Sequence, residues 1–232
     1  MKRVLFSIAA AALTTSVASA GTVNIVSDNA NSTEQLGSYE GSLTYDSELS
    51  LLTVILKNTT VGVTSAKLTG FVFNIDGNAT ATFIDSDNLT TDGFNESAFD
   101  NTGSASASPF GTFDFGAAIG GNFLGGGSPN PGIGIGTTGI FQFNLSGADA
   151  GGLDVMDFFS TDNGETSYSF VARFKGIEPG GFSDKVPSLI TGNPPPPSGH
   201  VVPLPPAAWS GLATMALSGI CMGRQKLKVL MA

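Results

Sequence analysis

Large apolar residues that alternate with small or polar ones are the feature that most restricts the fold of this chain. In residues 140–145, Phe141, Phe143 and Leu145 occupy every second position. Successive side chains of a β-strand point to opposite faces, so this period of two predicts a strand with one face in a core. The same alternation, or a short β-prone run, occurs in residues 22–27, 42–46, 51–57, 68–76, 79–85, 110–115, 168–175 and 186–190.

Turn and loop signals separate these strands. Residues 47–50 predict a hairpin turn, and Asp76 followed by Gly77 predicts a tight turn into a returning strand. Residues 86–109 are small and polar, which predicts a long loop. Residues 116–139, here called the glycine-rich segment, hold ten glycines and predict a loop between strands.

Short strands joined by glycine-rich turns predict an all-β fold for residues 21–192, an antiparallel two-sheet β-sandwich. One short helix is expected at residues 149–160, where Leu153, Met156 and Phe159 recur at a spacing of three. Most of the 17 Phe residues are expected to pack between the sheets, each stabilising the fold by about 1.5–3 kcal/mol when fully buried. The alternation also predicts an edge strand at residues 186–190, buried Phe73, Phe143 and Phe170, and exposed Lys57 and Arg173.

Charges are divided unevenly along the chain. Residues 21–192 hold all 19 acids but only five of the ten bases, which gives this part a net charge of −14. Such an acidic surface argues against nucleic acid and anionic lipid headgroups as partners, and it suits an exported protein among polysaccharide and divalent cations. The one cysteine, Cys221, lies outside this part, so the β domain contains no disulfide and depends on its hydrophobic core.

Residue types that catalysis often needs are scarce. The one histidine, His200, lies in a proline-rich linker at residues 193–201, which argues against a His-dependent triad and against a zinc site. The glycine-rich segment lacks the Gly-Lys-Ser/Thr ending of a phosphate-binding loop. Paired carboxylates of a glycosidase are the alternative, but most acids are Asp in turns, and no Trp lies in residues 21–192 to stack on sugar rings. The chain is therefore predicted not to be an enzyme, with no catalytic residue and no required cofactor.

Calcium is the one ligand ion that the pattern favours. Asp76, Asp85 and Asp87 lie with Asn74 and Asn88 in two short clusters of oxygen-bearing side chains, which a hard cation accepts. Neither cluster has the spacing of an EF-hand loop. Ordinary Asp-containing turns are the alternative interpretation.

The N-terminus has the pattern of a secretory signal peptide at residues 1–20. Two basic residues precede an apolar run at residues 4–13, and residues 18–20, Ala-Ser-Ala, form a small-residue cleavage site. The mature chain is therefore expected to begin at Gly21. A retained N-terminal anchor is the alternative.

Near the C-terminus, an uncharged and mostly apolar run at residues 207–223 predicts a single transmembrane helix. Such a helix is ~25 Å long, slightly short of the ~30 Å hydrocarbon core of a bilayer. Trp209 at the outer interface and snorkelling lysines can absorb that difference. A basic end that stays in the cytoplasm closes the run, with Arg224, Lys226 and Lys228. A buried core helix is the alternative.

The segment before this run is rich in proline and biased to extended geometry, and its residues 202–205 are Val-Pro-Leu-Pro. Together with the apolar run and the basic end, residues 202–228 resemble a PEP-CTERM protein-sorting signal. The resemblance implies recognition and cleavage by an exosortase, a membrane-embedded transpeptidase-like enzyme, during delivery to the cell surface. Leu204 stands where the usual signal has Glu, as in Val-Pro-Leu-Pro variants, and Gln225 and Leu227 dilute the basic end.

Parts of the β domain, residues 51–76 and 170–187, resemble β-rich domains that often carry such signals, and this likeness implies no known activity. The sequence thus predicts an exported, non-enzymatic cell-surface or extracellular-matrix protein, membrane-anchored through its C-terminal helix until it is processed. The alternative is a β-sandwich that binds extracellular polysaccharide. An exposed aromatic strip in a concave face would favour that alternative, and absence of such a groove would favour a structural role.

Overall fold

The computed structural model describes residues 20–84, 98–125, 127–161 and 168–191. The chain divides into two compact units, Met1–Ser198 and Gly199–Ala232, and all described residues belong to the first. The predicted signal peptide up to residue 19, the linker and the sorting signal lie outside the described residues. Within the described ranges, no helix is long and apolar enough to span a membrane.

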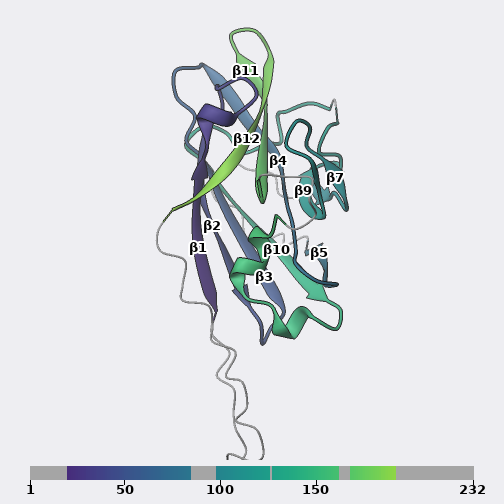
Figure 1. The fold of residues 1–232 in the computed structure, drawn as a ribbon. Helices are drawn as coiled ribbons and strands as arrows, with labels where there is room; N and C mark the ends of the chain where they lie inside the picture. Colours follow the sequence, from purple (N-terminus) through teal and green to yellow (C-terminus); the bar gives the residue numbers. More distant parts are fainter. Residues whose placement is uncertain (1–19, 85–97, 126, 162–167, 192–232) are drawn as a thin grey trace, which may run out of the picture. The chain divides into compact units, whose positions relative to one another are not determined.

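These ranges fold into β-strands and short 3₁₀ helices (Figure 1). The strands are β1 (Gly21–Ser27), β2 (Tyr39–Asp46), β3 (Leu51–Asn58), β4 (Ser65–Phe73), β5 (Thr80–Ile84), β6 (Phe99–Asn101), β7 (Ala105–Ser106), β8 (Thr112–Phe113), β9 (Phe115–Ile119), β10 (Thr138–Ser146), β11 (Phe170–Glu178) and β12 (Phe182–Thr191). The 3₁₀ helices are η1 (Asn29–Asn31), η3 (Ala150–Gly152) and η4 (Val155–Phe159).

Ten strands form one antiparallel sheet in the order β5-β10-β3-β2-β1-β12-β11-β4-β9-β6, and β7 pairs with β8 separately. Strand β12 joins the two halves of this sheet, because residues 188–191 pair with β1 and residues 182–187 pair with β11 (Figure 1). The prediction of an all-β antiparallel fold is confirmed. The prediction of an edge strand at residues 186–190 is wrong, because β12 has a hydrogen-bonded neighbour on each side.

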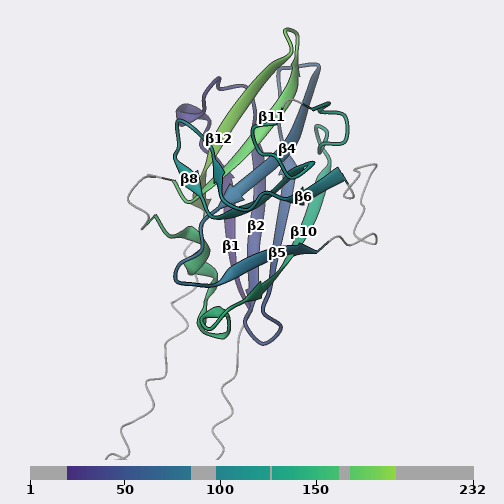
Figure 2. The same cartoon turned by 90° about the vertical axis from the view of Figure 1, so that its right-hand side faces the viewer.

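The two halves of the sheet face each other around an aromatic core. Phe71 of β4 meets Phe141 of β10 edge to face, with ring centroids 4.8 Å apart. The last strands of the sheet, β5 and β6, come near each other (Figure 2), and the Asn101 side-chain amide donates to the Ala81 carbonyl at 3.3 Å. The layers are therefore two halves of one folded sheet, where the sequence predicted two separate sheets.

The chain crosses from one half to the other at the turn of Asp76 and Gly77. Gly77 has a φ of +80°, and the Asn78 N–H donates to the Asp149 carboxylate at 2.9 Å, which fixes the turn. Strand β5 follows as expected, but it pairs with β10 and not with β4. A tight-turn dipeptide indicates a change of direction without specifying the strand that will be met, so the sequence could not show this pairing.

A second, smaller core covers the outer face of β4. Val72 of β4 and Val171 of β11 are fully buried there, packed with Phe113 and Phe123. Strand β4 is therefore buried on both faces, as strands in the middle of a layered structure are. The alternation within β4 separates two cores, whereas alternation in β3 separates core from surface.

The helix expected at residues 149–160 is replaced by the two 3₁₀ helices η3 and η4. The spacing of three that suggested a helix is the period of a 3₁₀ helix, which has three residues per turn. At the start of η4, the Asp154 side chain accepts from the Met156 N–H, and the Asp157 side chain accepts from the Asp154 N–H, each at 2.6 Å. This reciprocal capping satisfies donors that a short helix cannot pair internally.

The predicted burial is confirmed for Phe73, Phe143 and Phe170, which have no exposed surface, and Lys57 is exposed as expected. The prediction for Arg173 is wrong, because this side chain is half-buried. It does point away from the aromatic core, but the glycine-rich segment covers it.

Candidate functional site

Four of the five bases in residues 21–192 gather on the outer face of β4, β11 and β12. Lys175 of β11 is in register with Lys67 of β4, and Arg173 of β11 is in register with Lys185 of β12. Residues two apart in a strand share a face, and so do partners in register. Lys67, Arg173, Lys175 and Lys185 therefore form one basic cluster, the name used for them below.

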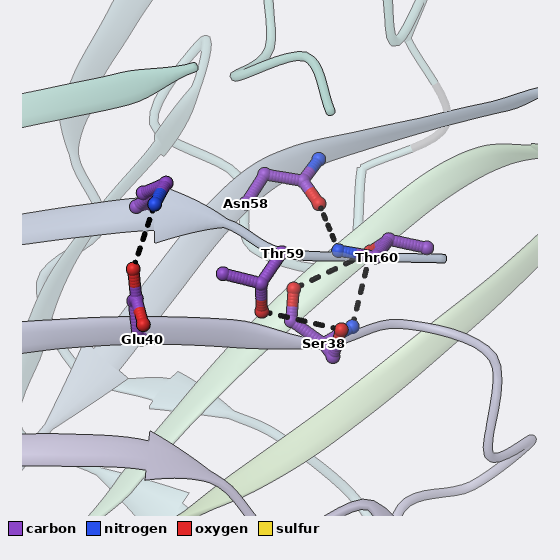
Figure 3. Close-up of polar contacts among 6 residues, drawn as sticks. Ser38, Glu40, Asn58, Thr59 and Thr60 are labelled. Atoms are coloured by element: carbon purple, nitrogen blue, oxygen red, sulfur yellow. Dashed lines mark hydrogen bonds and ion pairs between the residues drawn. The ribbon is translucent and has the colours of Figure 1, made fainter. Parts of the chain in front are cut away.

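The carboxylates that act on the basic cluster are Asp184 and Glu34, near Lys185, and neither forms an ion pair with it. None of its four cations lies within ion-pair distance of a carboxylate in the described part of the chain. The fifth base, Lys57, does pair with Glu40 on the neighbouring strand at 2.9 Å (Figure 3). Like charges placed directly opposite each other in a sheet are destabilising. In so acidic a domain, this arrangement is a local departure from what stability favours, and such departures concentrate at functional sites.

Neutral carbonyl groups of the surrounding loops accept hydrogen bonds from the cluster. The Arg173 guanidinium donates to the carbonyls of Phe123 and Gly125, the latter at 3.1 Å. The Lys175 ammonium donates to the carbonyls of Gly125, also at 3.1 Å, and Gly127. These bonds hold the glycine-rich segment against β11, which explains the partial burial of Arg173. Carbonyls supply partial negative charge only, so the net charge of the cluster stays positive.

Burial and mutual repulsion act on these cations together. Burial lowers the pKa of the Arg173 guanidinium. The pKa values of Lys175 and Lys185 are also lowered, with burial as the larger cause and the charge of Arg173 as the next. For Lys185, the nearby Asp184 and Glu34 carboxylates oppose this change in pKa. The fold therefore disfavours the positive charge of Arg173, Lys175 and Lys185, and a bound anion would relieve that cost.

A small cavity adjoins the basic cluster, and an open groove adjoins that cavity. A cavity of about 20 Å³ lies between Arg173, Lys175, Thr69 and the glycine-rich segment, and a cavity of this size holds roughly one water molecule. An open groove of about 350 Å³ lies beside it, and both hollows are lined by Asn122. The other lining residues of the groove are Thr102, Ser104, Ala105, Ser106, Gly121, Phe123 and Leu124. The groove is therefore mainly a surface of hydroxyl, amide and backbone groups.

Aromatic stacking is not available in this groove. Phe123 is 3% exposed, and Phe182, at the β11–β12 hairpin, is the one aromatic residue with half its surface exposed in the described part of the chain. Recognition here would rest on charge and hydrogen bonding.

The far end of the glycine-rich segment is attached to a second set of polar contacts. Asn58, which is fully buried at the end of β3, donates through its side-chain amide to the carbonyls of Ala66 at 3.1 Å and Ile133 at 2.9 Å. Its side-chain oxygen accepts from the Thr60 N–H at 3.1 Å, and Thr60 in turn accepts from the Ser38 N–H at 3.0 Å (Figure 3). The segment is thus fixed at both ends, which keeps the groove in place.

Asp184 of β12 is a buried carboxylate that the sequence did not single out. It is 1% exposed and accepts five hydrogen bonds from the β1–β2 connection, at 2.8–3.3 Å. The donors are the hydroxyls of Ser32 and Thr33 and the N–H groups of Glu34, Leu36 and Gly37. Every lone-pair direction of the carboxylate is engaged, so its role is to shape this connection.

The calcium candidates are only partly visible. Asp85 and Asp87 lie outside the described residues. Asp76 is exposed, and its carboxylate accepts from the Gly77 N–H of its own turn at 2.8 Å. In the described ranges, no group of three or more His, Cys, Asp or Glu side chains is placed to hold a metal ion.

We therefore expect Asp76 to act as a turn residue. The difference between the melting temperatures measured with a chelator and with millimolar calcium should be the same for the wild-type protein and for Asp76→Asn, because the asparagine oxygen can still accept from Gly77. A calcium-dependent rise in melting temperature that Asp76→Asn abolishes would contradict this expectation, since a ligand of the folded state alone stabilises it.

The residues of the predicted sorting motif all lie outside the described residues; they are Val202, Pro203, Leu204, Pro205, Trp209, Arg224, Lys226 and Lys228.

No protein-family model, curated protein or solved structure matches the chain. Within the described ranges, the basic cluster and its groove are the arrangement with the clearest chemistry. They offer cationic N–H donors beside hydroxyl and amide groups, which suits binding of an anion that also carries hydrogen-bonding groups.

Proposed function

We propose that the protein is an exported, non-enzymatic cell-surface or extracellular-matrix protein, in which a sandwich-like β domain is delivered by a C-terminal sorting signal. The observation that carries this proposal is the order of features along the chain. A signal peptide precedes the β domain, and a proline motif, an apolar run and a basic end follow it. Each feature alone is common, whereas the ordered set is typical of exported proteins that are held in the membrane and then processed.

The physical sequence of events follows from these features. The signal peptide starts moving the chain outward, the apolar run at residues 207–223 stops transfer, and the basic residues after it stay inside. The proline motif then lies at the outer membrane–water interface, extended and poor in internal hydrogen bonds. An extended segment suits the active site of a processing enzyme of the exosortase type. Cleavage near Pro205 would release residues 21 to about 205 from the helix.

Substitutions in the two parts of the signal should have different effects. Leu217→Arg should cost about 2–4 kcal/mol of membrane insertion and move the unprocessed precursor into the medium. Replacing Pro203 and Pro205 by alanine should leave the precursor in the membrane and block its cleavage. Immunoblots of membrane, surface and medium fractions measure both outcomes, with Leu217→Ile as the matched control.

That control should behave like the wild-type protein, because it keeps the run apolar. Equal processing of all variants would contradict the proposed signal. A full-length native chain found soluble in the cytoplasm with Met1 retained would contradict export itself.

A second candidate function is supported by a separate observation. The open polar groove near the basic cluster supports the alternative of a domain that binds extracellular polysaccharide. The exposed aromatic strip that would also favour it is not seen in the described ranges. Binding would then depend on the cations, and this dependence makes the candidate testable.

A further inference from the structure

We infer that the basic cluster and the adjoining groove bind an acidic polysaccharide, with the carboxylates of its sugar units on the four cations and its hydroxyls in the groove. This inference rests on the second candidate function above and names its ligand class. It starts from the cluster and not from the fold, which many unrelated functions share.

The first step concerns charge. Two pairs of like charges, Lys67 with Lys175 and Arg173 with Lys185, lie in register on adjacent strands, and the described carboxylates leave them unpaired. Residues 21–192 hold 19 acids and five bases, and the fold places four of these bases together. This arrangement creates a repulsion that a wider distribution of the bases would avoid. A carboxylate bound between the cations would replace this repulsion with attraction and charge-assisted hydrogen bonds.

The second step concerns shape. The register pairs extend over β12, β11 and β4, so the cations form a diagonal strip about 10 Å across, given the usual spacing of about 4.8 Å between strands. Asn122 lines both the open groove and the cavity at Arg173 and Lys175, which are the middle of the strip, so the groove lies to one side of the strip. Charges along a strip and hydroxyls along a groove fit an extended chain that carries both kinds of group.

Other polyanions fit this surface less well than an acidic polysaccharide does. A flat anionic bilayer or a nucleic-acid duplex would approach much more of the surface than the strip, and the domain as a whole carries a charge of −14. Those partners would meet net repulsion. A single slender chain can contact the basic strip alone. An acidic peptide is equally slender, but it lacks the hydroxyl groups that would use Thr102, Ser104 and Ser106.

The test uses the full-length protein in detergent and immobilised polygalacturonate, with binding measured at low and high salt. Arg173 and Lys175 hold the glycine-rich segment, so they are left unchanged in the test. The variant is Lys67→Glu, because the Lys67 side chain makes no hydrogen bond in the described part of the chain. Lys57→Glu is the control with the same change of net charge, on a residue outside the cluster. We expect Lys67→Glu to weaken binding about tenfold or more and Lys57→Glu to change it about twofold or less, with high salt weakening wild-type binding.

Melting temperatures of both variants show whether the fold is retained. Equal binding by the two variants, or binding that salt does not change, would overturn the inference. Binding of poly-glutamate or of anionic lipid vesicles as tight as that of polygalacturonate would also overturn it, because the groove would then contribute nothing. Failure to bind in a protein that is still exported and processed removes the ligand assignment alone, whereas loss of export removes the proposed function.

Discussion

Replacing Phe143 with alanine is expected to lower the free energy of unfolding by about 3–5 kcal/mol, because the change opens a cavity in the centre of the aromatic core. Phe143 has no exposed surface. Its ring centroid lies 5.3 Å from that of Phe73 on the facing half of the sheet and 5.5 Å from that of Phe83 on the adjacent strand. The side chain thus contributes to contacts within one half and between the two halves.

Thermal unfolding followed by circular dichroism measures this effect. For a domain of this size each kcal/mol corresponds to roughly 2–4 °C, so the melting temperature should fall by about 6–20 °C. Phe182→Ala removes the same side chain where half of its surface is exposed, and it should change the melting temperature by only a few degrees. An unchanged melting temperature for Phe143→Ala would contradict the register assigned to β10.

Asp184→Ala is expected to destabilise the fold by a similar amount, about 3 kcal/mol, because it leaves five donors of the β1–β2 connection without their acceptor, among them the buried Gly37 N–H. The N–H groups of Leu36 and Gly37 lie within 2.9 Å of the Asp184 carboxylate. Gly37 cannot move away easily, since a Cβ at its position would already lie 2.5 Å from the Phe174 ring. The Gly37 N–H would therefore stay buried and unpaired.

Denaturant unfolding of Asp184→Ala, Asp184→Asn and Glu34→Ala separates this role from a general effect of removing an acid. Glu34 bonds Asp184 through its backbone N–H, which Glu34→Ala retains, so that variant should have nearly wild-type stability. Asp184→Asn keeps one acceptor oxygen and should fall between the other two. Equal stability of Asp184→Ala and Glu34→Ala would show that the buried carboxylate does not organise the β1–β2 connection.

Local pattern was sufficient to predict most strands and the residues they bury. Phe141, Phe143 and Leu145 are inward on β10 because a period of two leaves a strand only one way to bury them. For Val72, the period of two shows only that its side chain is on the opposite face of β4 from Phe71 and Phe73. It does not show that a second core covers this face. Burial on both faces depends on residues 105–123, which are distant in sequence from β4.

The candidate site was harder to predict because it depends on register between distant strands. Alternation did place Arg173 and Lys175 on the outer face of β11. Nothing in the sequence shows that Lys67 and Lys185 lie beside them, because this requires knowing that β11 pairs with both β4 and β12. The signal in the sequence was that residues 21–192 hold 19 acids and only five bases, which makes the positions of those bases informative.

The intact mass of the protein recovered from the native cell surface tests most directly whether the chain is exported and then processed at its C-terminus. One mass determines both ends of the chain together with any modification. The expected mass is that of a chain that begins at Gly21 and ends near Pro205, without the apolar run and the basic end. A mass corresponding to residues 1–232, or a mature N-terminus followed by an uncleaved C-terminus in the surface fraction, would contradict it.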